Sequence, residues 1–372
     1  MPVHCLCSLF CFTFLFSPTF IWGLCGWFYI MRLSPRPYLI SALALAAALL
    51  LSVAVGSVFI PPAALWDLIK AALTGGQPSL PQADTYAAIL FSLRLPRTLM
   101  MAFTGAALAT SGGAYQGLFR NPLADPYLIG VASGAGLGAV LAMTAQWPQK
   151  FGVLVTVPLA AFAGALLTVL AVYQLGRVGR SVPTTSLILA GVAVSSFCTA
   201  LTSFLMLNAT GELRRALVWL LGGSTLSGWQ PVLAVLPYLA VGCGILLTSG
   251  HALNVMQFGD EQAHQLGLPV ERVRRLIVIA ATLTTAAAVA FSGVIGFVGL
   301  IVPHLMRLLW GGDYRRLLPL SMLCGAAFLL VADVLARSLM APQELPVGVI
   351  TSLAGAPFFL WVLRRAKQQS FW

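Results

Sequence analysis

Residues 38–60 read YLISALALAAALLLSVAVGSVFI and contain no Asp, Glu, Lys or Arg. A helix needs about 20 apolar residues to cross the roughly 30 Å hydrocarbon core of a bilayer, so this stretch is long enough to span a membrane. The rest of the chain has the same character, because 59% of its 372 residues are hydrophobic and only 8% are charged. A soluble domain carries about 25% charged residues. The sequence therefore predicts an all-α, polytopic membrane protein.

Apolar runs separated by short polar segments recur along the chain and predict about ten membrane-spanning helices. With the N-terminus placed inside, two-thirds of the 21 Lys and Arg residues fall in inner loops. This bias follows the positive-inside rule and predicts a multi-pass protein of the cell membrane with both termini in the cytoplasm. The expected spans are 38–59, 97–118, 127–146, 151–175, 184–207, 228–249, 276–295, 297–311, 317–337 and 346–363, with shorter helices at 61–73 and 212–222.

The first thirty residues differ from the rest, because they are rich in Cys, Phe and Trp and carry no charged side chain. A secretory signal would open with positive charges. Met31 is followed by Arg32 and Arg36 and then by the first apolar run, as expected for a chain start with a cytoplasmic flank. We therefore expect Met31 to be the initiator, residues 1–30 to be an upstream extension, and residues 31–372 to form a single membrane domain. The alternative interpretation of residues 1–30 is an extra amphipathic or membrane segment.

The composition argues against several function classes. The net charge of +11 resides in short loops between apolar runs, so it indicates membrane orientation rather than nucleic-acid binding. The seven Cys show no metal-ligand spacing, and no metal site is expected. Lys70, Lys150 and Lys367 are the three lysines of the chain, and none lies in a Gly-Lys-Ser/Thr phosphate loop. Any ATPase that drives this protein must therefore be a separate chain.

One acidic residue lies well inside a predicted span. Asp333 has Arg337 one helical turn further on, which predicts a local ion pair. His304 follows Pro303 in a short span, and we interpret it as a packing or helix-end residue rather than a ligand. No set of nucleophile, base and acid stands out, so we do not expect an enzyme.

A polar stretch, residues 259–269, reads GDEQAHQLGLP. Asp260 and Glu261 suit the positive end of a helix dipole, and Gly267 suits the end of that helix. Pro269 suits the start of a second short helix, and the arginines at 272, 274 and 275 would hold the chain at the inner membrane surface. The stretch predicts two short cytoplasmic helices that dock a soluble partner, with an ordinary loop as the alternative.

Four further stretches carry a resemblance to a known family: RLPRT at 94–98, QGLFRNPLADP at 116–126, GFVGLIVPH at 296–304 and ELPVGV at 344–349. With the polar stretch they resemble the permeases of iron-siderophore, haem and vitamin B12 importers, the type II ABC importers, over about residues 38–366. The resemblance implies ten helices per subunit and a homodimer with the translocation path on its two-fold axis. It also implies two ATPase subunits that hold ATP and magnesium, an extracytoplasmic substrate-binding protein, and no cofactor on this chain.

The resemblance further assigns roles to individual residues. It implies that three external arginines, Arg94, Arg97 and Arg337, receive glutamates from the binding protein. It implies that residues 258–275 form coupling helices on the ATPase, with contacts at Gly259, Asp260, Glu261, Ala263, Leu266 and Gly267. The motif positions to which it gives a structural role are Asn121, Pro122, Asp125, Pro126, Gly296, Gly299, Pro303, His304, Pro346 and Gly348.

Two other kinds of transporter are the alternatives. A related importer for bare zinc or manganese ions predicts His or acidic ligands along the path, where the sequence offers His264 and His304. An ion-coupled secondary carrier keeps acidic residues or histidines within its spans, and Asp333 is such a residue. For the importer of metal chelates, a ferric siderophore, haem and cobalamin are all consistent with the resemblance.

Overall fold

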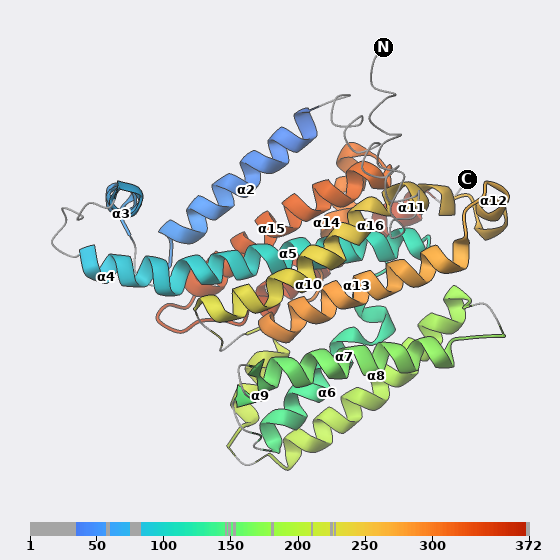
Figure 1. Ribbon diagram of the computed structural model, residues 1–372, viewed down its shortest axis with the longest axis horizontal. Coiled ribbons are helices and arrows are strands. Elements are labelled where there is room, and N and C mark those ends of the chain that lie inside the picture. Colours follow the sequence, from blue (N-terminus) through green and yellow to red (C-terminus); the bar gives the residue numbers. More distant parts are fainter. Residues whose placement is uncertain are drawn as a thin grey trace, which may run out of the picture.

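The described part of the chain is helical almost throughout (Figure 1). The computed structural model describes residues 35–56, 60–74, 83–145, 147, 150–151, 154–179, 182–209, 211–223, 226 and 228–369. The expected extension at residues 1–30 and the expected start at Met31 lie outside these residues. Two short strands, β1 (Lys150–Phe151) and β2 (Leu154–Val155), form a small antiparallel pair.

Seven of the described helices are long and apolar enough to cross a membrane. They are α2 (Arg36–Ala54), the stretch from α4 to α5 (Ala83–Leu118), α7 (Thr156–Leu175), α8 (Thr184–Leu207), α10 (Trp229–Thr248), α13 (Val270–Ser292) and α15 (Tyr314–Ser338). Three shorter apolar helices occupy the remaining expected spans: α6 (Val131–Thr144), α14 (Val298–Trp310) and α16 (Val347–Gln369). The prediction of an all-α membrane protein with about ten spans is therefore confirmed.

Short helices connect these spans. The short helices predicted at 61–73 and 212–222 are present as α3 (Pro62–Thr74) and α9 (Leu213–Leu220). The first of the two short helices predicted in the polar stretch is α12 (Asp260–Gln265). Two more, η2 (Pro126–Ile129) and α11 (Gly250–Met256), were not predicted as separate helices.

The second span begins earlier than the sequence predicted. The helices α4 (Ala83–Ala87), η1 (Ala88–Arg94) and α5 (Leu95–Leu118) follow one another without a break. Pro96 cannot donate a backbone hydrogen bond and would interrupt a regular α-helix. The turn η1 is π-helical, so Leu95 donates to the carbonyl of Leu90, five residues back, and the helix continues through the proline. Arg94, which we expected in an external loop, therefore lies within a helix.

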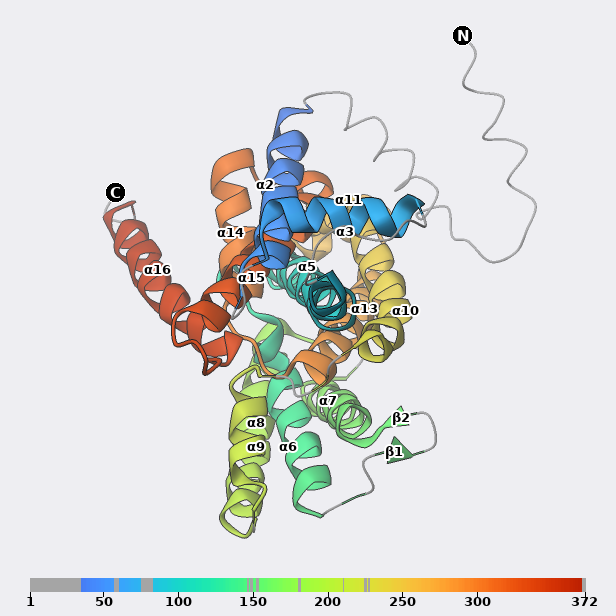
Figure 2. The same cartoon turned by 90° about the vertical axis from the view of Figure 1, so that its left-hand side faces the viewer.

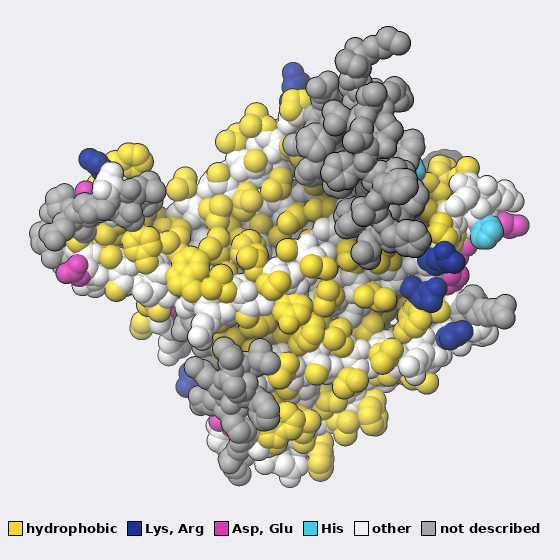
Figure 3. Space-filling model, in the orientation of Figure 1, with side chains coloured by type: hydrophobic (Ala, Val, Ile, Leu, Met, Phe, Trp, Pro, Cys, Tyr) yellow, Lys and Arg dark blue, Asp and Glu magenta, His cyan; other side chains and the backbone are white. Residues whose placement is uncertain are grey.

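Helix α5 lies at the centre of the larger of two groups of helices. Most of its residues from Thr98 to Leu118 are buried, and α2, α10, α13, α14 and α15 pack around it. The second group is formed by α6, α7 and α8, and α13 contacts α6 and α7 (Figures 1 and 2). Apolar side chains cover much of the visible outer surface, while charged side chains gather toward its ends (Figure 3). This distribution is what contact with lipid requires.

The two ends of the bundle can be distinguished by their contacts. Helices α2 and α15 run in the same direction. Ser41 near the start of α2 contacts Cys324 in the middle of α15, and Ser52 near the end of α2 contacts Arg337 near the end of α15. Helix α15 begins beside α11, and α16 ends toward the same end of the bundle as α12 (Figure 1). The first and last described helices thus meet the same end of the bundle, which we call the α12 end. The opposite end carries Arg97 and is called the arginine end.

Glycine allows α5 to approach its neighbours closely. A Cβ atom added at Gly112 would clash with the backbone of Gly299 in α14, and one at Gly105 would clash with the carbonyl oxygen of Gly325 in α15. Small residues permit such backbone contact between helices in a membrane. These contacts place α14 and α15 directly against the central helix.

We expect Gly112→Ala to lower the free energy of unfolding by about 1–3 kcal/mol, because the added methyl group forces α5 and α14 apart. Gly244→Ala in α10 is the matched control, since a Cβ there meets no atom within 4 Å. Thermal unfolding of the two purified variants in the same detergent measures the difference. Equal unfolding temperatures would contradict the close contact between α5 and α14.

Candidate functional site

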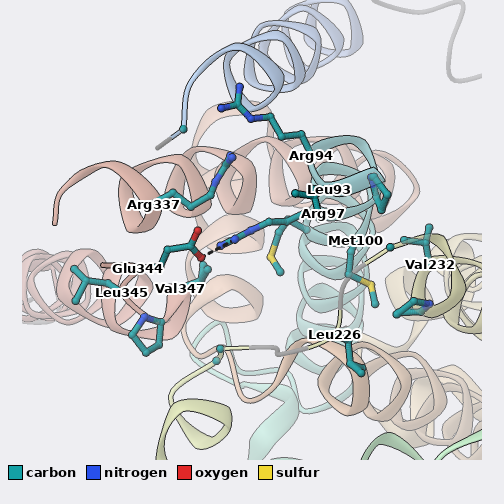
Figure 4. Close-up of a pocket in the computed structure, with 18 of the residues that line it drawn as sticks. Leu93, Arg94, Arg97, Met100, Leu226, Val232, Arg337, Glu344, Leu345 and Val347 are labelled. Carbon is teal, nitrogen blue, oxygen red and sulfur yellow. Dashed lines mark hydrogen bonds and ion pairs between the residues drawn. The ribbon is translucent and has the colours of Figure 1, made fainter. Parts of the chain in front are cut away.

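The three predicted docking arginines lie together at the arginine end (Figure 4). Arg94 comes from η1, Arg97 from α5 and Arg337 from α15, and Glu344 joins them from the loop before α16. All four line a cavity of about 560 Å³. Residues 94 and 337 are distant in the sequence, and the packing of α15 against α5 brings them together.

Asp333 is the centre of this charged cluster. Its carboxylate is fully buried and lies 3.0 Å from the Nε of Arg337, four residues further along α15, which confirms the predicted ion pair. Its second partner, Arg97, is not indicated by any pattern in the sequence. The Nη2 of Arg97 lies 2.9 Å from Oδ1 of Asp333, and the Nε of Arg97 donates to the same oxygen at 3.0 Å. One buried carboxylate therefore holds two of the three arginines.

Arg94 and Arg337 are engaged with the end of α2. Arg94 donates from Nη1 to the carbonyls of Val53 and Ala54 at 2.8 and 3.1 Å. Arg337 donates from Nη2 to the carbonyl oxygen of Ser52 at 3.2 Å and to its hydroxyl at 3.1 Å. The last carbonyls of a helix lack partners within it, and cations there satisfy them and complement the helix dipole. Both arginines are consequently buried, with exposed fractions of 6% and 5%.

Arg97 differs from the other two because a third of its side chain, 32%, is exposed. Its Nη1 donates to Oε2 of Glu344 at 2.7 Å, and the Glu344 side chain is 47% exposed. In this structure Arg97 is thus the arginine of the cluster that presents the most surface to a partner, while Arg94 and Arg337 hold α2.

The motif positions at residues 121–126 and 296–304 meet inside the bundle. Asn121 accepts a hydrogen bond from the Leu123 amide, and Asp125 caps η2 by accepting from the Tyr127 amide. The Tyr127 hydroxyl donates to the carbonyl of Ile295 at 2.8 Å. These turns fix the re-entry of the chain between α5 and α6.

The remaining motif residues act mainly through packing. A Cβ at Gly299 would meet the ring of Pro126 at 3.0 Å, and one at Gly348 would clash with the carbonyl of Leu221. Pro303 is buried within α14, and the His304 ring lies edge-on to Phe358, with centroids 6.3 Å apart. Other motif positions have more room: a Cβ at Gly296 would meet nothing within 4 Å, Pro122 is exposed and Pro346 is half-buried.

The α12 end carries the second candidate site. The expected first short helix is α12, and Gly259 and Gly267 flank it with positive φ angles of 105° and 84°. The prediction of a second short helix after Pro269 is wrong, because the helix that begins at Val270 is the 23-residue span α13. The apolar run continues past the arginines, so nothing ends that helix at the membrane surface. The second short helix of this region is instead α11, which follows α10 after Ser249.

Two large apolar side chains project from the α11–α12 segment. Phe258 and Leu266 are each 67% exposed, beside the exposed acids Asp260 and Glu261. Ala263 is fully buried, so it supports α12 from within instead of presenting a surface. Paired apolar anchors with a polar rim are typical of protein–protein interfaces.

Arg274 fixes the position of α12. Its side chain is 8% exposed and forms ion pairs with Asp260 of α12 and, at 2.7 Å, with Glu271. The sequence pattern groups Arg274 with Arg272 and Arg275, but of the three only Arg272 and Arg275 are exposed. Arg274 lies on the side of α13 that faces α12, where Asp260 supplies a carboxylate.

Hydrogen bonds connect the α11–α12 segment to the central helices. Asn254 of α11 donates to Asp313 at 2.6 Å and accepts from the Tyr314 amide at 2.9 Å, at the start of α15. Gln257 donates to the carbonyl of Gly117 in α5 at 2.9 Å. Burial raises the pKa of Asp313, but hydrogen bonds from Arg315 and Asn254 outweigh it, so its pKa lies below the ordinary value. A displacement of α11 is therefore transmitted to α5 and α15.

Comparisons with known proteins agree with this arrangement. The model of the FecCD transport family matches residues 44–365. The cobalamin import system permease protein BtuC of Halobacterium salinarum is 44% identical over 345 residues, with 89% of this chain and 90% of the relative covered. The hemin transport system permease protein HmuU of Yersinia pestis is 41% identical over 284 residues, covering 76% and 84%.

A solved structure gives the same result. It is described as an inward-facing conformation of a metal-chelate type ABC transporter, and it matches with a TM-score of 0.74 and 31% sequence identity. The match covers 89% of this chain and 99% of the other. The matching relatives are transport subunits, not enzymes. The chain therefore belongs to the FecCD transport family and is a membrane-spanning permease of the ABC importers.

Proposed function

We propose that this permease works as a homodimer that imports a metal chelate delivered by an extracytoplasmic binding protein. Two ATPase subunits bind at the α12 end and supply the energy from ATP and magnesium. The observation that carries the proposal is that two candidate interaction surfaces, the arginine end and the α12 end, lie at opposite ends of the central helix α5. Arg97 lies at one end of α5, and Gln257 is bonded to Gly117 near the other.

The α12 end suits a cytoplasmic ATPase. Phe258 and Leu266 supply exposed apolar anchors, and Arg274 holds α12 against α13. An ATPase that closes on nucleotide would push on α12, and the bonds of Asn254 to residues 313 and 314 would pass that displacement to α15. On this reading the α12 end and both termini are cytoplasmic, as the positive-inside bias predicts.

The arginine end suits an acidic partner outside the membrane. Arg–carboxylate pairs can be bidentate, so they fix the register of two proteins as well as their attraction. Arg97 is exposed enough to accept a carboxylate directly. Arg94 and Arg337 contribute through the positive potential of the cavity and by holding the end of α2 in place.

Helix α8 supports a translocation path at a dimer axis. It exposes a polar stripe, Ser196, Thr199 and Ser203, on the wall of a cavity of about 830 Å³. Ser196 and Ser203 donate to carbonyls of α8 itself, and their hydroxyl oxygens can still accept from water, which suits a water-filled path. A second copy of the chain facing α8 would close this cavity into a channel with weakly interacting walls.

We propose a metal chelate of the cobalamin or haem type as the cargo. The supporting observation is that relatives at 44% and 41% identity are named for cobalamin and hemin transport. The chelate is transported and is not a cofactor of this chain.

The decisive experiment measures ATP hydrolysis by the permease co-purified with its ATPase in lipid. The binding protein is added empty or loaded with cobalamin, haem or a ferric siderophore, and one loaded form is expected to stimulate hydrolysis. Arg97→Gln is expected to raise the half-maximal concentration of binding protein at least about ten-fold, because a charge pair at the interface is lost. Arg215→Gln, which breaks the exposed pair with Glu212, is the matched control and should change little.

A different outcome would favour a different transporter. If no ATPase co-purifies, and uptake survives loss of the ATPase but stops when the proton gradient collapses, the protein is an ion-coupled carrier. Stimulation by free zinc or manganese in place of the chelates would point to the metal-ion importer.

A further inference from the structure

We propose that Glu344 occupies the position on Arg97 that a carboxylate of the binding protein takes on docking. Docking is then an exchange of one carboxylate for another, and Glu344 sets how readily the partner binds. This inference rests on the proposed function and adds to it an internal competitor of the partner.

Arg97 already has carboxylates on both sides. Its Nε and Nη2 are directed to Asp333 at 3.0 and 2.9 Å, and its Nη1 donates to Glu344 at 2.7 Å. The guanidinium presents five N–H donors in a rigid, planar fork, and Asp333 takes the Nε/Nη2 side. A new carboxylate that pairs with the exposed Nη1 side therefore competes with Glu344 for the same nitrogen.

Of the two carboxylates, Glu344 is the one that can leave. Asp333 is fully buried and shared with Arg337, so its removal would leave the buried Arg337 without a carboxylate. Glu344 is 47% exposed and belongs to the loop between α15 and α16. Exposed ion pairs contribute little to stability because water competes for both partners. Figure 4 shows Glu344 reaching across the cavity to Arg97.

The charges around the cavity favour an incoming carboxylate. Arg94, Arg97 and Arg337 line it, while Asp333 and Glu344 supply the two carboxylates that contact them. When Glu344 leaves Arg97, the local positive charge is available to the partner, and its desolvation at the interface strengthens the new pair.

The exchange also acts on the start of α16. Leu345 donates from its amide to the carbonyl of Ala336, and Gly348 packs against the carbonyl oxygens of Leu221 and Val294. Release of Glu344 loosens the loop that leads into this contact. Docking would thereby alter the contacts of Gly348 with Leu221, which follows α9, and with Val294, which follows α13.

The test measures the affinity of the binding protein for the complete permease–ATPase complex in lipid nanodiscs. The probes are the binding protein loaded with cobalamin, haem or a ferric siderophore. Glu344→Gln is expected to tighten binding by about three-fold to ten-fold, because the competitor loses its charge. A gain of affinity cannot arise from misfolding, so the direction of the change is informative by itself.

Two further variants separate the exchange from a general charge effect. Glu212→Gln removes the same charge from a similarly exposed pair and should leave the affinity unchanged. The double variant Gln343→Glu with Glu344→Gln keeps the net charge but moves it one residue along the loop, and it should bind as tightly as Glu344→Gln. Wild-type affinity in both Glu344 variants, or weaker binding by Glu344→Gln, overturns the exchange. Absence of binding by the wild-type complex with all three probes instead overturns the proposed function.

Discussion

Asp333→Asn is expected to lower the free energy of unfolding by about 3–5 kcal/mol, the cost of removing one partner from a buried ion pair. The carboxylate is fully buried and balances both Arg97 and Arg337. Asparagine keeps the shape but not the charge, so the buried Arg337 would lose its carboxylate and Arg97 would keep only the half-exposed Glu344. The end of α2 would loosen with them, because Arg337 also bonds to Ser52. Unfolding of the purified protein by SDS in mixed micelles measures the loss.

The matched control is Glu212→Gln, whose pair with Arg215 is about one-third exposed on both sides. This substitution should lower the free energy of unfolding by no more than about 1 kcal/mol. A double variant, Asp333→Leu with Arg337→Met, should lose less than Asp333→Asn alone, because apolar side chains can replace a buried pair. If Asp333→Asn is as stable as the control, Asp333 does not hold the cluster together.

Much of the fold could be predicted because the membrane leaves few choices. A run of apolar residues such as 184–207 must form a helix, since lipid offers no partner for backbone groups. Helix α8 accordingly has the predicted bounds. The predicted start of the second span was wrong because of Pro96. Proline usually interrupts a helix, but here a π-helical turn lets the helix continue through it.

The candidate sites were predictable where partners are near in the sequence. The pair of Asp333 and Arg337 follows from one helical turn of spacing. The contact of Arg97 with Asp333, 236 residues apart, depends on how α5 packs against α15, and no sequence pattern specifies that. For the same reason the burial of Ala263 could not be predicted, although its place on α12 could.

The two ends of the protein are linked by the same helices. Helix α5 carries Arg97 at its start, and its end accepts a hydrogen bond from Gln257. Helix α15 begins at the contacts of Asn254 and ends with Arg337. Because both helices are largely buried and closely packed, they transmit displacement rather than absorb it. Events at one surface therefore have a direct structural route to the other.

Phe258→Ser combined with Leu266→Ser is expected to weaken binding of the ATPase at least about 100-fold. Truncating a central apolar anchor of an interface costs about 2 kcal/mol or more, and a tenfold change corresponds to about 1.4 kcal/mol. Both residues are 67% exposed, so their replacement removes little packing within the chain. Titration of the ATPase onto the detergent-solubilised permease measures the affinity, and thermal unfolding checks the fold.

The matched control replaces two exposed apolar residues at the arginine end, Leu339→Ser with Met340→Ser, which are 62% and 53% exposed. This variant should bind the ATPase as the wild type does, because its changes lie on the opposite surface. Unchanged ATPase binding by the Phe258 and Leu266 variant would contradict a coupling role for the α11–α12 segment. An equal loss in both variants would show that surface apolarity in general, rather than this segment, governs the assembly.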